Sequence, residues 1–376
     1  MSTLNVQGIV KYFGEAVALD HVSFTLTQDD FFVLTGPSNS GKSTMLHTLN
    51  GRELPDEGSI VLNNTDITFN SPSERNVALV SQTYGLASQL SVYDNIAQAL
   101  HARRLSKKAI KQHVQSALEM LELTHVQKTP LHNLSGGELQ RVAIARAMVR
   151  NVDLYLFDSP LSQIDPHTRA RIQDALHALH RLKLAICISV TPDPFEAFSL
   201  GNWVAIIKQG KIQQIGKPHE IIEHPANLFV AQFISQPPLN QLEALIATTD
   251  TGYQLQTDGL TIALSSHWRP IIEQLEPHTH LIIGIRPKII ILEWALITSN
   301  TSTWIKLTAY ILSIDLLMGK RTIQLRIGSQ TILTADVKDI HQSALQPGKT
   351  ITIGIDPAQI YLFHPQTQEL LKAKKA

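Results

Sequence analysis

The segment from Gly36 to Ser43 constrains the fold of this chain more than any other part of the sequence. It reads GPSNSGKS, fits the pattern G-x-x-x-x-G-K-[ST], follows the apolar run FFVLT and precedes a helical pattern. In this context the glycines let backbone N–H groups close around phosphate oxygens at a helix N-terminus. Lys42 would reach the terminal phosphates, and the Ser43 hydroxyl would suit a magnesium ion. The flanking strand and helix therefore favour a phosphate-binding loop over a plain glycine turn.

Residues 1–235 alternate short apolar strands with helical patterns. One example is DLYLFD, which is followed by a long helical run and then by the apolar run LAICISV. This alternation predicts an α/β domain with a largely parallel sheet. Residues 84–150 are mostly helical by pattern and lie between two strands, which predicts an inserted helical subdomain.

The pattern changes after residue 235. Pro237 and Pro238 cannot continue a helix, so residues 236–243 are expected to form a linker. Beyond it, apolar residues alternate with polar residues or glycine, as in IQLRI and ITIGI. A period of two indicates half-buried strands, and about seven short strands would make an all-β, OB-like barrel domain over residues 244–376.

The composition excludes several classes of protein. Lys plus Arg and Asp plus Glu both total 32, so no charge excess points to nucleic acid. Cys187 is the only cysteine, which argues against a disulfide framework and fits a reducing compartment. The N-terminus has no apolar segment of signal-peptide length, and no run of about 18 apolar residues occurs. We therefore expect a cytoplasmic chain that meets a membrane only through another protein.

A second anion-binding motif follows at Leu134–Arg141, which reads LSGGELQR. Ser135, Gly136 and Gly137 precede an amphipathic helix and can form a nest of N–H donors, which one nucleotide cannot share with the first loop of the same chain. This segment resembles the signature sequence of the ATP-binding-cassette (ABC) ATPases. The resemblance implies that the nest closes on ATP held by another subunit.

Further motifs extend this resemblance over nearly the whole chain. Leu154–Asp158 is an apolar strand that ends in a carboxylate and resembles the Walker B element, whose aspartate holds magnesium through water. Gln82 matches a glutamine that contacts magnesium and senses the membrane subunits. Asp165 lies in a segment that matches the loop which, in the family, communicates across the dimer. Phe13 matches the aromatic residue that stacks on adenine; Tyr12 is the fallback, and either ring could instead be core.

The resemblance thus implies two ligands, ATP and Mg²⁺. Asn39 stands where related loops often have glycine, and asparagine tolerates the left-handed backbone better than most residues. The residues expected to contact nucleotide are Phe13, Gly36, Ser38, Asn39, Gly41, Lys42, Ser43, Thr44, Ser135, Gly136, Gly137 and Asp165. Those expected at magnesium are Ser43, Gln82 and Asp158.

Two catalytic positions depart from the family pattern. Active members have a glutamate after the Walker B aspartate, where this chain has Ser159, and a switch histidine where VTPDPFEA places Pro192. Serine cannot take a proton from the attacking water, and loss of a positioned base slows chemistry by roughly 10²–10⁴-fold. Asp193 could substitute, but it matches an aspartate already present in the pattern. We expect a site that binds ATP without turning it over.

The C-terminal part resembles the β domain of importer ATPases of the maltose and glycerol-phosphate type. The similarity rests on GIRPKIIIL, which contains Arg286 and Pro287, and on IYLFHPQTQELL. Such proteins work as cytoplasmic dimers that power two membrane permeases.

Three interpretations follow from this combination. The chain could pair with a catalytically complete paralogue, form a slow homodimer in the same kind of importer, or act as a non-catalytic ATP-binding regulator.

Overall fold

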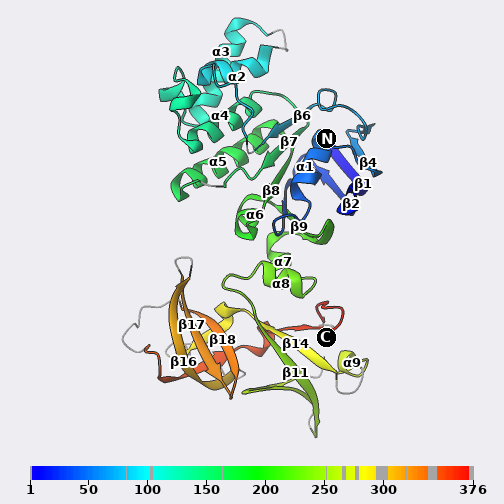
Figure 1. Cartoon of the computed structure of the whole chain (residues 1–376), viewed down its shortest axis with the longest axis vertical. Helices are drawn as coiled ribbons and strands as arrows, with labels where there is room; N and C mark the ends of the chain where they lie inside the picture. Colours follow the sequence, from blue (N-terminus) through cyan, green and yellow to red (C-terminus); the bar gives the residue numbers. More distant parts are fainter. Residues whose placement is uncertain are drawn as a thin grey trace. The chain divides into compact units, whose positions relative to one another are not determined.

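The computed structural model divides the chain into two units, Met1–Ile221 and Ile222–Ala376 (Figure 1). The residues that the structure describes are 2–81, 83–101, 105–162, 164–250, 252–264, 268–275, 279–293, 304–317, 320–337 and 345–371.

The first unit is built on a six-stranded sheet with the strand order β10-β9-β3-β8-β7-β6. Its strands are β3 (Phe31–Thr35), β6 (Val77–Val80), β7 (Leu154–Asp158), β8 (Ile186–Thr191), β9 (Trp203–Lys208) and β10 (Lys211–Gly216). All of them pair in parallel except β10, which runs antiparallel to β9. Every residue of β3 and β8 is buried, as expected for parallel strands covered on both faces.

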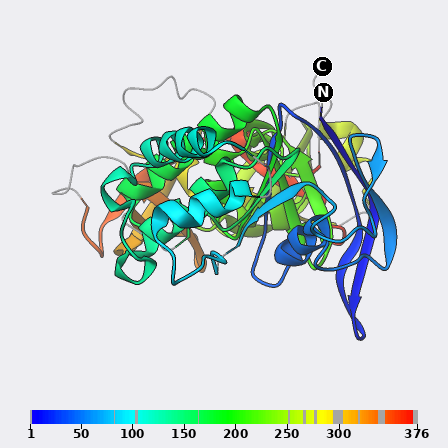
Figure 2. The ribbon, with the colours of Figure 1, turned by 90° about the horizontal axis from the view of Figure 1, so that it is seen from above.

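A second, antiparallel sheet of the first unit has the order β2-β1-β4-β5. It comprises β1 (Thr3–Phe13), β2 (Ala16–Thr27), β4 (Glu57–Leu62) and β5 (Thr65–Asp66). Apolar residues of both sheets and of helix α1 (Lys42–Asn50) share one core. Figures 1 and 2 agree that the β1–β2 hairpin and helices α2 and α3 lie on opposite sides of this unit.

Between β6 and β7 the chain is helical, as the sequence predicted. The helices are α2 (Val92–His101), α3 (Lys107–Met120) and α4 (Gly136–Met148), with the short 3₁₀ turns η1 (Thr124–Val126) and η2 (Leu131–Asn133). Helix α4 packs against α2 and α3. The unit continues with α5 (Pro166–Lys183), α6 (Pro194–Leu200) and α7 (Pro218–Glu223), the last of which spans the division.

The second unit contains two five-stranded antiparallel sheets, ordered β13-β12-β11-β14-β20 and β15-β19-β16-β17-β18. The strands are β11 (Asn240–Thr249), β12 (Gly252–Thr257), β13 (Leu260–Ala263), β14 (His280–Ile285), β15 (Ile290–Leu292), β16 (Ile305–Leu317), β17 (Lys320–Ile327), β18 (Thr331–Val337), β19 (Thr350–Ile355) and β20 (Tyr361–Phe363). Short helices α8 (Leu228–Phe233), α9 (Arg269–Ile272), η4 (Pro287–Ile289) and η5 (Pro357–Gln359) complete the unit.

Both sheets of the second unit contribute to one core, which confirms the predicted fold class of an α/β domain followed by an all-β domain. The alternating isoleucines of β17 and β19 are buried, as the period of two predicted. The described part holds ten strands rather than about seven, because several are too short to show alternation. The side chain of Asn240 joins the sheets: it donates to Ile285 O and Thr334 O and accepts from Thr334 N.

Helix α8 shares a small core with β14 and β20, so the division falls before the linker that the sequence indicates. The domain limits inferred from the sequence stay a prediction. Of the helices that the structure describes, none is long and apolar enough to cross a membrane.

Candidate functional site

The phosphate-binding loop connects the end of β3 to the start of α1, and its glycines are sterically required. A Cβ on Gly36 would lie 2.1 Å from Ile207 O. Gly41 has φ +104°, and a Cβ there would lie 2.4 Å from Ala18 O. Asn39 has φ 61°, the left-handed conformation that the sequence anticipated. The loop is therefore fixed by its backbone.

Lys42 is the first residue of α1 and is buried. Its Nζ donates to Gly36 O at 2.9 Å and Pro37 O at 2.7 Å, and lies 3.3 Å from Ser40 Oγ. Burial lowers the pKa of Lys42, while the nearby charge of Asp158 raises it. Helix α1 has no side-chain cap and no acidic residue in its first turn, so its N–H groups are open to an anion. This arrangement fits the phosphates of a nucleotide.

The other expected nucleotide contacts around this loop lie at or near the surface. Ser38, Asn39 and Ser43 are exposed, and Thr44 is half-buried. Phe13, at the end of β1, is 49% exposed and Tyr12 is 44% exposed, so neither ring is core. Phe13 pairs with Ala16 in the β1–β2 hairpin, and this hairpin reaches Gly41 through Ala18. The predicted adenine-stacking position is therefore close to the phosphate loop. Gln82 lies outside the described residues.

The strand register places Asp158, Ser159 and Pro192 at the same edge of the sheet as the phosphate loop. Thr35 pairs with Thr191 and Asp158 pairs with Val190, so Gly36, Ser159 and Pro192 each follow the end of an adjacent strand. Burial raises the pKa of Asp158. Three effects oppose that rise: the charge of His47, a hydrogen bond from the Ser159 hydroxyl and the charge of Lys42.

The residues present fit a magnesium ion only together with phosphate oxygens. No group of three His, Cys, Asp or Glu side chains that could hold a metal occurs in the part of the chain that the structure describes. Magnesium usually keeps several waters and is bound through one or two carboxylates plus substrate phosphates. Asp158, with the exposed Ser43 hydroxyl on α1, matches that donor set.

The neighbours of both departures, Asp158 and Asp193, already make hydrogen bonds within the chain. Ser159 is buried, its N–H donates to Val190 O at 2.9 Å and its hydroxyl lies 3.4 Å from Asp158 Oδ1. Pro192 is exposed. The Asp193 carboxylate accepts the Phe195 N–H at 2.8 Å and caps α6, so it already has a structural role.

Glu196, which belongs to no recognised motif, is buried in the first turn of α6. Burial raises the pKa of Glu196 to about 7. A hydrogen bond from Thr191 and the charge of Arg169 lower this pKa, whereas the charge of Asp193 raises it. Its Oε1 has no hydrogen-bond partner among the described residues. No local pattern could reveal this group, because its raised pKa comes first from burial, which only the tertiary fold creates.

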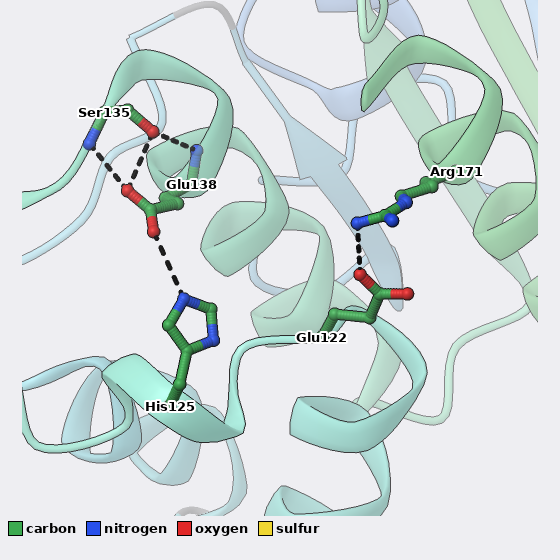
Figure 3. Close-up of polar contacts among 5 residues, drawn as sticks. All are labelled: Glu122, His125, Ser135, Glu138 and Arg171. Atoms are coloured by element: carbon green, nitrogen blue, oxygen red, sulfur yellow. Dashed lines mark hydrogen bonds and ion pairs between the residues drawn. The ribbon is translucent and has the colours of Figure 1, made fainter. Parts of the chain in front are cut away.

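The signature forms the N-terminus of α4 (Figure 3). Ser135 caps the helix: its Oγ accepts from Glu138 N at 3.3 Å and donates to Glu138 Oε2 at 2.7 Å, and Ser135 N donates to the same oxygen at 2.9 Å. A Cβ on Gly136 would meet nothing within 4 Å, and one on Gly137 would meet only Thr168 Cγ2 at 3.5 Å. The fold of this chain therefore does not itself require these two glycines.

The signature and the phosphate loop are not joined within the chain. Across the described residues, no hydrogen bond or ion pair connects positions 135–137 with positions 36–43. Instead, the hydroxyl of Tyr84 lies 3.5 Å from Gly136 O, and Arg146 binds Tyr84 O and Gly85 O. Asp165 caps α5 by accepting from His167 N and Thr168 N. The sequence had marked neither Tyr84 nor Arg146.

Comparison with known proteins agrees with this geometry. The family model described as "ABC transporter" matches residues 19–162. The sn-glycerol-3-phosphate import ATP-binding protein of Bordetella bronchiseptica is 33% identical, with 95% of each chain covered. The trehalose/maltose import ATP-binding protein of Thermococcus litoralis is 31% identical, with 98% of this chain and 99% of that protein covered.

Solved structures give the same result for part of the chain. A dimeric ATP-binding cassette in a post-hydrolysis state, bound to ADP and inorganic phosphate, is 28% identical. It matches with a TM-score of 0.53 over 57% of this chain and 98% of its own. With a fold, a phosphate loop, a signature helix and full-length relatives that agree, this chain belongs to the ABC transporter family.

Proposed function

We propose that this chain is the ATP-binding subunit of an ABC importer for a sugar or a glycerol phosphate. The full-length similarity to import ATP-binding proteins of these two kinds supports the direction of transport and the class of solute. The subunit would act at the cytoplasmic face of the membrane, as one of two cassettes bound to two permease subunits.

The chain's own half-site would bind Mg-ATP and hold it. Lys42, the uncapped N-terminus of α1 and the glycine-defined loop support binding of the triphosphate. Asp158 and Ser43 supply oxygens for the magnesium ion, which would neutralise phosphate charge. Gln82, by resemblance, completes the set. Phe13 would stack on adenine, since its ring is exposed near the loop.

The half-site lacks the groups that make the bound ATP react. Ser159 replaces the general base and its neighbour Asp158 already accepts its hydroxyl, while Pro192 has no side-chain donor. Nucleotide bound here would stabilise a pair of cassettes rather than drive a cycle of hydrolysis.

The single observation that carries the rest of the proposal is the open surface around Gly136. Glycine at the start of a helix loses entropy on folding, and nothing in this chain occupies the space that a Cβ would fill. A ligand from outside the chain would account for a glycine there. We infer that Ser135, Gly136 and Gly137 complete the ATP site of a second, catalytically competent cassette, with Asp165 communicating across the pair.

Calorimetry with Mg-ATP tests the binding half of this proposal. The purified chain should bind Mg-ATP, and Lys42→Ala should weaken binding strongly because it removes the only lysine in the loop. Equal absence of heat from the chain and from Lys42→Ala at millimolar nucleotide would refute the proposed function.

A further inference from the structure

The carboxylate of Glu138 already accepts the hydrogen bond of the Ser135 hydroxyl, the same hydrogen bond that a γ-phosphate would need. Ser135 has one hydroxyl proton, and it points to Glu138 Oε2 at 2.7 Å. Hydrogen bonds from the Ser135 N–H and hydroxyl lower the pKa of Glu138, so this carboxylate is ionised. A phosphate arriving from a partner cassette would have to take this proton from an ionised carboxylate and approach its negative charge.

Two positive groups act on Glu138. The charge of Arg141 on α4 lowers the pKa of Glu138 more than that of His125 does, and His125 of η1 lies with its Nε2 3.6 Å from Glu138 Oε1. Figure 3 shows that Glu122 forms an ion pair with Arg171, while His125 points to Glu138. His125 is therefore the side chain from another element that contacts the Glu138 carboxylate directly.

We propose that His125 is a positioning residue for the signature: acting through Glu138, it sets how readily Ser135 turns its hydroxyl to a γ-phosphate held by another cassette. The contact from His125 adds to the charge of Arg141 and reduces the repulsion between the Glu138 carboxylate and the incoming phosphate. Without His125, the carboxylate keeps the Ser135 proton more firmly and repels the phosphate more strongly. This inference rests on the proposed function of the signature.

The chain offers variants that separate this role from folding. Glu138→Gln keeps a residue suited to the capping box at this helix position but removes the charge. His125→Gln removes the ion pair. His113→Gln, on the exposed side of α3, is a matched control, because His113 is not among the groups that act on Glu138.

The experiment is sedimentation of the purified full chain with Mg-ATP, which measures the affinity of the nucleotide-dependent dimer. All variants are compared at one pH. We expect His125→Gln to weaken the dimer about two- to fivefold. Glu138→Gln should tighten it about fivefold or more.

The double variant gives the sharpest result. If His125 acts through Glu138, His125→Gln should have no further effect once Glu138 is glutamine. Additive effects, equal behaviour of His125→Gln and His113→Gln, or no ATP-dependent dimer in wild type and Glu138→Gln alike would overturn the proposal. Calorimetry of the same samples separates the two hypotheses: intact ATP binding with any of these outcomes leaves the proposed nucleotide site standing, whereas lost ATP binding removes both.

Discussion

Ser159 has a left-handed backbone, with φ 52°, directly after the Walker B aspartate. Its N–H and hydroxyl both bond to neighbours at the edge of the sheet. The Ser159 side chain is therefore held beside Asp158. Serine at this position lacks the basicity that the reaction requires.

Burial of Glu196 makes the first unit sensitive to pH. Its pKa in the folded chain is raised from 4.5 to about 7, so the folded state binds a proton more tightly than the unfolded state. The free energy of unfolding should therefore decline as pH rises from about 4.5 to about 7, by up to about 3 kcal/mol.

Glu196→Gln should remove that decline, and denaturant unfolding at several pH values measures it. The exposed Asp174, changed to Asn, serves as the control. A Glu196→Gln variant whose stability follows the same pH dependence as the wild type would contradict this account.

The sequence was sufficient to predict residues whose role depends on the local backbone conformation. Gly36, Gly41 and Asn39 follow from the loop pattern, and the structure confirms their steric need and backbone conformation. His125 could not be predicted in this way, because Glu138 lies on another element. Glu196 could not be predicted because its raised pKa comes first from burial, which only the tertiary fold creates.

At the scale of elements, the phosphate-binding helix α1 is fixed at its C-terminal end by a buried arginine. Arg75 is 1% exposed and donates to the carbonyls of Thr48, Leu49, Asn70 and Thr68. A cation at a helix C-terminus is favourable, and these bonds satisfy carbonyls that the helix leaves free.

Arg75→Met should lower the free energy of unfolding by roughly 3 kcal/mol or more, since it leaves several buried acceptors unpaired. It should also weaken Mg-ATP binding, because α1 carries Lys42. Arg52→Met, at an exposed position just after the same helix, should change neither quantity. Denaturant titration measures the free energy of unfolding of both variants, and calorimetry measures their binding of Mg-ATP. Equal stability of the two variants would show that the hydrogen bonds of Arg75 do not fix the end of α1.

In the second unit, Asp258 ties two turns together. Its carboxylate accepts the N–H groups of Ser329, Gln330 and Thr331, which lowers its pKa to about 2. The stabilisation is therefore present above about pH 4 and is lost as pH falls towards about 2.

Asp258→Asn should lower the thermal midpoint of the second unit at neutral pH and flatten its dependence on acid. Asp250→Asn, an exposed change in the same unit, is the control. Calorimetric melting of both variants at a series of pH values decides it; identical acid profiles would show that the three N–H bonds do not stabilise the turns.

Element types were predictable because hydrophobic period is a local signal. The alternation in β17 and β19 and the buried runs of β3 and β8 were each confirmed. The place of α8 was not predictable, because its apolar residues pack against strands more than 40 residues away in sequence. The number of strands was underestimated for a related reason: pairs such as β12–β13 are short and are recognised only by their register.

At the scale of the whole molecule, the proposed function requires that the chain supply an intact signature to a partner while its own site does not hydrolyse ATP. In the assembled transporter, Ser135→Arg should abolish ATP turnover, because an arginine would block the only competent composite site. Ser159→Ala should change turnover little, since no base is lost. Phosphate release from the reconstituted complex measures both, and turnover that survives Ser135→Arg would rule out the pairing with a competent cassette.

The most direct measurement is the rate of ATP hydrolysis by the purified chain, alone, compared with Ser159→Glu, Pro192→His and the double variant. The account predicts a wild-type rate at background. It also predicts an increase in the double variant that exceeds the two single effects combined, because both groups act on one transition state. A substantial wild-type rate that Lys42→Ala abolishes would contradict the account, since it would show a competent base elsewhere in the site.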